Sequence, residues 1–378
     1  MTLHFYITSI FIAFTLLRSC FLLVVLLCII ALHRYSQTCG IGLTYDSLNY
    51  LHASQTWLTK ERLLNQDGTL FLQQPPLFPI ILSFFSPYQQ VISSWANTFC
   101  LVITVFFWFW IGKSYIYDIK WLSLYLWLLV WATPLFLVHQ FLWSEPIYLF
   151  ISSLAFVALY QYEQKRTLIW LFCIIFCLLL LPLQRIVGIA LSVAVLIVIG
   201  LDKRNSISIK IALLVISILP IGTWLSVVYA YRTPQEFVAT YGMQTNFGEG
   251  IIVYANSLSL WFLPNFLPTW LRMCSLFLFF LFWFHLPQNR FSYMVLIYFL
   301  AYTVILLIKK SDFWDTERFV ALLYPCFLWL TFTGIANLKK QCLWLFAVAC
   351  LLCVYPTLRC AKNILFWKEA QCKKIDKN

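Results

Sequence analysis

The chain has 378 residues, of which 62% are hydrophobic and only 11% charged. Soluble domains contain about 45–50% apolar and about 25% charged residues, so this chain lacks the polar residues needed to coat a soluble fold. The net charge is +12, but the Lys and Arg residues occur singly or in pairs, which argues against a nucleic-acid-binding surface. Continuous apolar runs long enough to cross a bilayer therefore predict an all-α polytopic membrane protein, whereas outer-membrane barrels alternate apolar and polar residues.

The first apolar run, about 5–32, predicts a transmembrane helix. It contains Arg18 and has neither a basic N-terminal segment nor a small-residue cleavage site, so we interpret it as a retained span and not as a signal peptide. A long polar segment follows at about 33–74. Within that segment, residues 47–63 carry apolar side chains at roughly helical spacing, which predicts an amphipathic helix on the membrane surface.

After Pro75 and Pro76, the apolar stretch 77–85 is too short to cross a bilayer. We expect it to enter the membrane interface or to brace the next helix. Further spans are expected at about 91–112, 119–138, 146–160, 167–183, 186–201, 208–230, 270–286, 291–308, 319–337 and 341–357.

The predicted total is about eleven transmembrane helices. Pro182 and Arg185 predict a turn that divides one long apolar run. Residues 232–269 form a second long polar segment that contains glycines and prolines. No internal repeat or separate soluble domain is visible, so residues 1–378 are expected to form a single transmembrane domain.

The distribution of Lys and Arg predicts the orientation of the chain. With the N-terminus in the cytoplasm, the inner loops hold ten basic residues and three acids, and the outer loops hold nine of each. Basic residues favour the cytoplasmic side, so the segments 33–74 and 232–269 are expected to be outer loops. Eleven spans place the basic C-terminal tail outside, against this trend, and one miscounted span would move it inside.

The 13 cysteines lie mostly within apolar runs, where a thiol behaves as a small hydrophobic group. Cys350 and Cys353 have C-x-x-C spacing, but they lie in a predicted span without a second pair or a His cluster. We therefore expect neither a zinc site nor a disulfide framework.

The acidic residues gather in the predicted outer loops, and mid-span charges are nearly absent, which favours an enzyme site at the membrane surface over an ion path. Asp46 starts the amphipathic helix, where it would cap the helix, act as a base, or do both. Glu145 has similar helix-start surroundings. Arg185 either snorkels or binds a phosphate, and the cluster at 309–318 is either a solvated loop or an anion clamp.

Four segments together resemble bacterial GT-C glycosyltransferases, the membrane enzymes related to protein O-mannosyltransferases and to aminoarabinose transferases of lipid A. They are Thr44-Tyr45-Asp46-Ser47-Leu48-Asn49-Tyr50 with Gln74-Pro75-Pro76-Leu77-Phe78-Pro79, Ser144-Glu145-Pro146, Gln184-Arg185-Ile186-Val187-Gly188, and Glu317-Arg318-Phe319 before Tyr324-Pro325. The chain departs from the family pattern at Ser47, where many relatives carry a second acid, at Gln184 in place of Thr, and at Glu317 in place of Asp. It also lacks the large soluble C-terminal domain of some relatives.

The resemblance implies a bacterial inner-membrane enzyme that takes a sugar from a polyprenyl-phosphate donor on the outer face of the membrane. The acceptor would be a glycan, a lipid or a protein. Asp46 would be the general base in a displacement with inversion. The lipid phosphate or other parts of the substrate would be bound by the remaining candidates, which are Tyr50, Glu145, Arg185, Lys309, Lys310 and Arg318. No cofactor is required, and nothing indicates a divalent metal, although one is compatible with the reaction.

Two alternative functions remain open at this stage. A polysaccharide polymerase or ligase should have a large outer loop rich in Arg and His, but residues 232–269 contain only Arg232 and no His. A lipid or solute transporter should have paired broken helices or repeats, which the sequence does not show.

Overall fold

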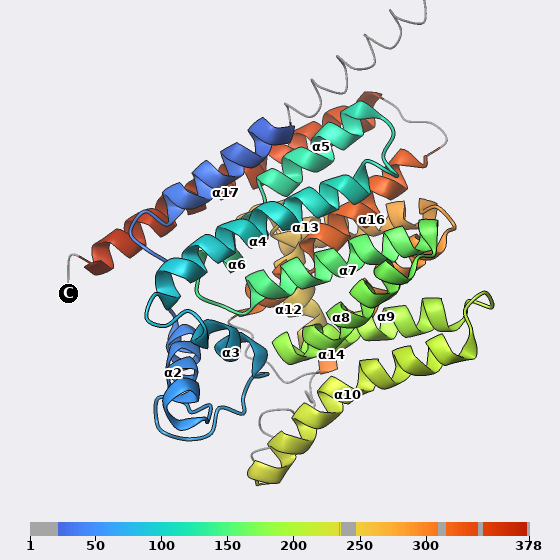
Figure 1. The fold of residues 1–378 in the computed structure, drawn as a ribbon. Coiled ribbons are helices and arrows are strands. Elements are labelled where there is room, and N and C mark those ends of the chain that lie inside the picture. Colours follow the sequence, from blue (N-terminus) through green and yellow to red (C-terminus); the bar gives the residue numbers. More distant parts are fainter. Residues whose placement is uncertain (1–21, 234, 236–246, 309–314, 339–342, 376–378) are drawn as a thin grey trace, which may run out of the picture.

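The computed structural model describes residues 22–233, 235, 247–308, 315–338 and 343–375, and these residues form a helical bundle (Figure 1). A helix at Leu22–Ser36 is followed by α2 (Tyr45–Lys60), α3 (Leu77–Ser83), α4 (Gln89–Gly112), α5 (Ile119–Val130), α6 (Thr133–Gln140), α7 (Glu145–Lys165), α8 (Leu168–Gln184), η1 (Ile186–Gly188), α9 (Ile189–Gly200), α10 (Ile207–Tyr231), α12 (Phe247–Ser259), α13 (Thr269–Phe282), η2 (Trp283–His285), α14 (Arg290–Ile308), α15 (Thr316–Ala321), α16 (Tyr324–Ala336) and α17 (Leu343–Ile375).

The predicted fold class, a polytopic helical membrane protein, is confirmed. Within the described residues, α4, the α5–α6 pair, α10, α14 and α17 are long and apolar enough to cross a membrane. Five shorter apolar helices accompany them: residues 22–36, α8, η1–α9, α13–η2 and α16. Together with α7, these elements correspond to ten of the eleven predicted spans and to the end of the first, whose residues 5–21 lie outside the described residues.

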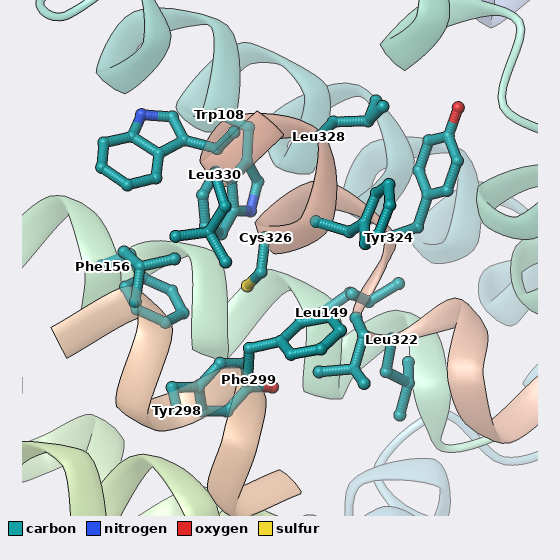
Figure 2. Close-up of a cluster of buried hydrophobic side chains, with 14 of the residues drawn as sticks. Trp108, Leu149, Phe156, Tyr298, Phe299, Leu322, Tyr324, Cys326, Leu328 and Leu330 are labelled. Atoms are coloured by element: carbon teal, nitrogen blue, oxygen red, sulfur yellow. The ribbon is translucent and has the colours of Figure 1, made fainter. Parts of the chain in front are cut away.

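Aromatic and aliphatic side chains pack together in the buried core of the bundle (Figure 2). Trp108 of α4 packs against Phe156 of α7 with the ring centroids 5.1 Å apart and the ring planes tilted by 53°, and Phe156 also contacts Tyr298 of α14. The Trp108 indole donates a hydrogen bond to Ser153 at 3.0 Å. Because these rings are almost fully buried, they fix α7 between α4 and α14 and thereby place the first turn of α7.

The predicted turn near Arg185 is present. Helix α8 ends at Gln184, and η1 follows directly before α9. A Cβ atom on Gly188 would lie 2.4 Å from the carbonyl carbon of Leu181, so only glycine permits η1 to approach the end of α8 this closely. The approach leaves Arg185 in the extended link between the two helices.

Three predicted boundaries differ from the structure. The span expected at 119–138 is divided into α5 and α6, with Pro134 in the first turn of α6. The second polar segment contains α12, which packs on α13 and α15. The last helix continues past Pro356 to Ile375, because a proline removes only one helical hydrogen bond and the bundle buries apolar side chains beyond it. These are Cys360, Ile364 and Trp367.

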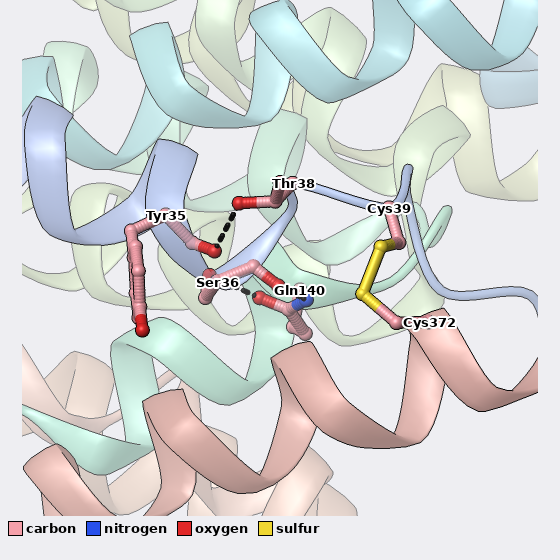
Figure 3. Close-up of a disulfide and its surroundings, with 6 residues drawn as sticks. All are labelled: Tyr35, Ser36, Thr38, Cys39, Gln140 and Cys372. Carbon is pink, nitrogen blue, oxygen red and sulfur yellow. Dashed lines mark hydrogen bonds between the residues drawn. A yellow bond between two sulfur atoms is a disulfide. The ribbon is translucent and has the colours of Figure 1, made fainter.

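The expectation of no disulfide is wrong in one respect. Cys39 forms a disulfide with Cys372, with the two Cα atoms 5.1 Å apart (Figure 3). Beside it, the Ser36 hydroxyl donates to the Gln140 side chain at 2.7 Å. The disulfide places the end of α17 next to the start of the first polar segment, so both lie at the same end of the bundle.

Residues predicted for the inner loops meet at the opposite end. Asp202, whose side chain is 1% exposed, forms ion pairs with Arg166 at 3.0 Å and with Arg290. Arg166 follows the last residue of α7, whereas Glu145 is its first, and 21 helical residues span about 31 Å. The ion pairs of Asp202 and the first residue of α7 therefore lie at opposite ends of the bundle.

Candidate functional site

Arg318 lies at the centre of a cluster of charged residues at the end of the bundle that carries the disulfide. Its Nη1 donates to Asp46 at 2.7 Å and to Asp315 at 2.9 Å, and its Nε donates to Glu145. The Arg318 side chain is only 4% exposed. One planar guanidinium thus joins three carboxylates from three segments, using the fixed donor geometry that suits arginine to this task.

Glu145 binds the second guanidinium of the cluster. Its side chain is fully buried and forms ion pairs with both Arg185 and Arg318. It occupies the first position of α7, where the helix dipole favours a negative charge, and Pro146 follows it. A buried carboxylate needs compensating charges, and the two arginines supply them.

Asp46 is the most open of the predicted catalytic and binding residues that the structure describes in this cluster. Its side chain is 31% exposed, and it contacts Arg318 at one oxygen. The interpretation of Asp46 as a helix cap is wrong, because Thr44 is the N-cap and forms a capping box with Ser47. The Asp46 carboxylate is therefore not used to cap α2, and it is available for chemistry.

Tyr50 lies one turn after Asp46, but it is 1% exposed and packs against Phe78 with the ring centroids 4.7 Å apart. Burial raises the pKa of Tyr50, so its hydroxyl remains protonated, and it donates to Ser144 at 3.3 Å. Arg185 also donates to the Ser144 hydroxyl, at 3.1 Å. Tyr50 is therefore buried beside the cluster and is connected to Arg185 through the Ser144 hydroxyl.

Sequence reasoning had not selected Trp143 and Ser144 individually as site residues, and it included Asp315 only as a member of the cluster at 309–318. The Trp143 ring stacks on the Arg318 guanidinium at 3.9 Å, and its indole donates to Thr44 at 2.8 Å. Trp143 and Ser144 directly precede Glu145, so their position in that motif was the available signal. Asp315 precedes Arg318 by one helical turn, which is the spacing of neighbours on a helix.

The charges of the described cluster do not balance. Three carboxylates face two guanidiniums, so the described cluster carries one excess negative charge. Burial raises the pKa of Asp315, against the opposing effect of Arg318. Lys309 and Lys310, which were predicted to bind phosphate, lie outside the described residues.

The described part of the chain contains no group of three or more His, Cys, Asp or Glu side chains placed to hold a metal ion. The carboxylates of the cluster instead face arginines.

Two solved structures have a similar fold. ArnT from Cupriavidus metallidurans bound to undecaprenyl phosphate aligns with a TM-score of 0.56 and 12% sequence identity, over 85% of this chain and 61% of that chain. The apo structure of the same protein aligns with a TM-score of 0.57 and 11% identity, over 85% and 60%. This chain thus spans about three fifths of the length of ArnT. No protein-family model and no curated protein sequence matches the chain.

The structural comparison confirms the predicted GT-C-like fold, since ArnT is a GT-C aminoarabinose transferase. At this identity the comparison shows the fold and no particular reaction. Asp46, Glu145, Arg185 and Arg318 lie in the four segments that resemble GT-C enzymes. In the structure these four residues form one cluster.

Proposed function

We propose that the protein is a membrane glycosyltransferase that moves a sugar from a polyprenyl-phosphate donor to an acceptor hydroxyl. The observation that carries this proposal is the cluster itself, in which a partly exposed carboxylate, Asp46, lies against the buried guanidinium of Arg318. The GT-C-like fold, seen in ArnT with undecaprenyl phosphate bound, supports a lipid carrier as the donor.

In the proposed reaction, the acceptor oxygen attacks the anomeric carbon of the donor and the configuration inverts. The bond between that carbon and the phosphate oxygen breaks, and its electrons leave with the polyprenyl phosphate. Asp46 accepts the proton of the acceptor hydroxyl as a general base. Arg318 and Arg185 stabilise the charge that grows on the departing phosphate, together with Lys309 and Lys310.

Glu145 has a supporting role in this scheme. Its side chain is fully buried and lies between Arg185 and Arg318, so it orients both guanidiniums and does not reach a substrate hydroxyl. Trp143 adds a flat surface under Arg318. The arginines are therefore held in place before a donor arrives, which lowers the cost of reorganisation during the reaction.

The experiment that tests this proposal is sugar transfer by the purified full chain in lipid nanodiscs. A panel of radiolabelled polyprenyl-phosphate sugars is offered together with membrane extract as the source of acceptors. Transfer from at least one donor, lost in Asp46→Asn, supports the proposal. Transport of lipid or solute without any new glycosidic bond would refute it.

We also propose that the cluster faces away from the cytoplasm of a bacterial inner membrane. The Lys and Arg distribution supports this orientation. The Cys39–Cys372 disulfide supports it independently, because disulfides persist in oxidising compartments, and this one lies at the end of the bundle that carries the cluster. It also favours the outer side for the C-terminal segment.

Single-cysteine labelling tests the orientation. The disulfide is retained and the free cysteines are replaced. A cysteine at Thr69 should react with a membrane-impermeant maleimide in intact cells, and one at Ser206 only after lysis. The reverse pattern would place Asp46 in the cytoplasm and exclude a donor used on the outer face.

A further inference from the structure

Glu317, the residue before Arg318, does not face the charged cluster. Its two carboxylate oxygens each accept a hydrogen bond from Nη2 of Arg359, at 2.8 Å. Arg359 lies on α17 and is 17% exposed, and its Nη1 donates to the carbonyl of Leu260 at 2.7 Å. A single arginine of the last helix therefore connects α15 to the turn after α12.

The geometry of a helix explains why the side chains of Glu317 and Arg318 point in different directions. Consecutive helical residues point about 100° apart, so α15 directs Glu317 toward α17 and Arg318 toward Asp46 and Glu145. A rotation of α15 about its axis would move both side chains together. Any contact that fixes Glu317 consequently fixes the direction in which Arg318 leaves the helix.

Helix α15 has only six residues, too few to be stable alone. Its surroundings hold it at several points. The Thr316 hydroxyl lies 2.8 Å from that of Ser257 on α12, and the Tyr302 hydroxyl donates to the carbonyl of Phe319 at 2.9 Å. The pair with Arg359 is the contact among these that carries full charges on both sides.

Helix α17 is a firm support for this contact. Beyond Arg359, Cys360 and Trp367 are buried against the bundle. The disulfide at Cys372 then ties α17 to Cys39, seven residues before Asp46. The same helix thus meets the segment that carries Arg318 and the segment that carries Asp46.

We propose that Arg359 is a positioning residue for the candidate site: it holds Glu317 and thereby aims Arg318 at Asp46 and Glu145. The inference builds on the proposed sugar transfer, because positioning matters only where a reaction uses Arg318. It adds a residue that lies in none of the four segments resembling GT-C enzymes.

The first test compares sugar transfer by Arg359→Gln, Arg359→Lys, Glu317→Gln and the double variant Glu317→Gln/Arg359→Gln. The matched control is Lys368→Gln, which removes another cation of α17, one that lies over the Tyr35 ring and not near Glu317. We expect Arg359→Gln to raise the donor KM and lower kcat/KM roughly three- to fivefold, the upper range for a partly exposed ion pair, with unchanged acceptor KM. Arg359→Lys should lie between Arg359→Gln and the wild type.

The double variant distinguishes the pair from two independent contacts. If Arg359 acts through Glu317, the double variant is no worse than either single one. Effects that add would overturn the proposal. Glu317→Gln breaks the same pair at a side chain that is 39% exposed, so the test remains decisive even if Arg359→Gln does not fold.

A second measurement separates this inference from the proposed reaction. Hydrogen–deuterium exchange of the peptide spanning residues 315–323 is followed in the ligand-free full chain. Exchange should rise in Arg359→Gln and Glu317→Gln but not in Lys368→Gln. Unchanged exchange would refute positioning by Arg359. If exchange rises as expected but the wild-type chain transfers no sugar, the positioning of α15 by Arg359 stands and the proposed reaction is refuted.

Discussion

Replacing Asp46 by Asn separates catalysis from folding more cleanly than any other change at the site. Asn keeps the shape of Asp but cannot accept a proton at physiological pH. Among the described residues, Asp46 makes one ion pair, with Arg318 at 2.7 Å, and its side chain is 31% exposed. Partly exposed ion pairs contribute at most about 1 kcal/mol, so the variant should remain folded.

The expected loss of activity is much larger. General-base catalysis typically contributes about 10²–10⁴-fold, and the transfer rate of Asp46→Asn should fall by that factor. A loss of about 1 kcal/mol from a stability of about 5–15 kcal/mol leaves nearly all molecules folded, so misfolding cannot imitate this effect.

The assay measures the initial rate of transfer and the midpoint of thermal unfolding on the same preparations. Glu61→Gln is the matched control, because Glu61 is an exposed acid at the end of the same helix α2. It should keep the wild-type rate. An Asp46→Asn rate within about threefold of the wild type would remove Asp46 from the mechanism.

Three further predictions follow from the ion pairs. Glu145→Gln should destabilise the protein by about 3–5 kcal/mol, because it removes the charge shared by two buried guanidiniums and takes from Arg185 the carboxylate that it pairs with in the described structure. A thermal midpoint close to that of the wild type would contradict this. Arg185→Ala and Arg318→Ala should each raise the donor KM, with only partial rescue by Lys, which lacks the planar fork; donor kinetics unchanged in both would mean that the phosphate binds elsewhere. Burial alone would raise the pKa of Asp202, but hydrogen bonds from arginine outweigh it and the pKa is lowered. Asp202→Asn should therefore reduce stability at pH 7, and thermal unfolding should show the difference shrinking below the ordinary Asp pKa of 3.8, where the unfolded chain binds the proton. A difference that is independent of pH would refute this reasoning.

The sequence predicted the helices well because long apolar runs between charged interruptions have only one low-energy arrangement in a bilayer. The turn at Arg185 was visible from Pro182 and the polar pair beside it. The break before α6 was not, although Pro134 marks it, since an apolar run on both sides masks a short interruption. Helix α12 was missed because its first turn contains glycines, and its stability comes from packing on α13 and α15.

The members of the charged cluster were predictable from the sequence, but the ion pairs between them were not. Four short segments selected Asp46, Glu145, Arg185 and Arg318, and the structure brings all four together. The sequence could not reveal that Arg318 is the shared partner, or that Glu317 turns away to α17. Such pairings depend on the rotation of helices about their axes, which a one-dimensional pattern does not contain.

The disulfide was beyond prediction for a related reason. Thirteen cysteines permit many pairings, and most of them lie in apolar runs where no pairing is expected. Only the three-dimensional path of α17 brings Cys372 to Cys39.

The distance between these two cysteines along the chain bears on how the protein is made. They are 333 residues apart, so Cys39 emerges from the ribosome long before its partner is synthesised. At a translation rate of about 5–20 residues per second, the thiol of Cys39 waits for roughly 15–70 s before Cys372 is made, and in the proposed orientation it waits on the outer side of the membrane. During that interval it is exposed to pairing with the wrong cysteine, and Asp46 has neither Arg318 nor α17 beside it. The segment that carries Cys39 and Asp46 can therefore reach its final form only after the last helix has been made, and biogenesis of this protein should depend on enzymes that isomerise incorrect disulfides.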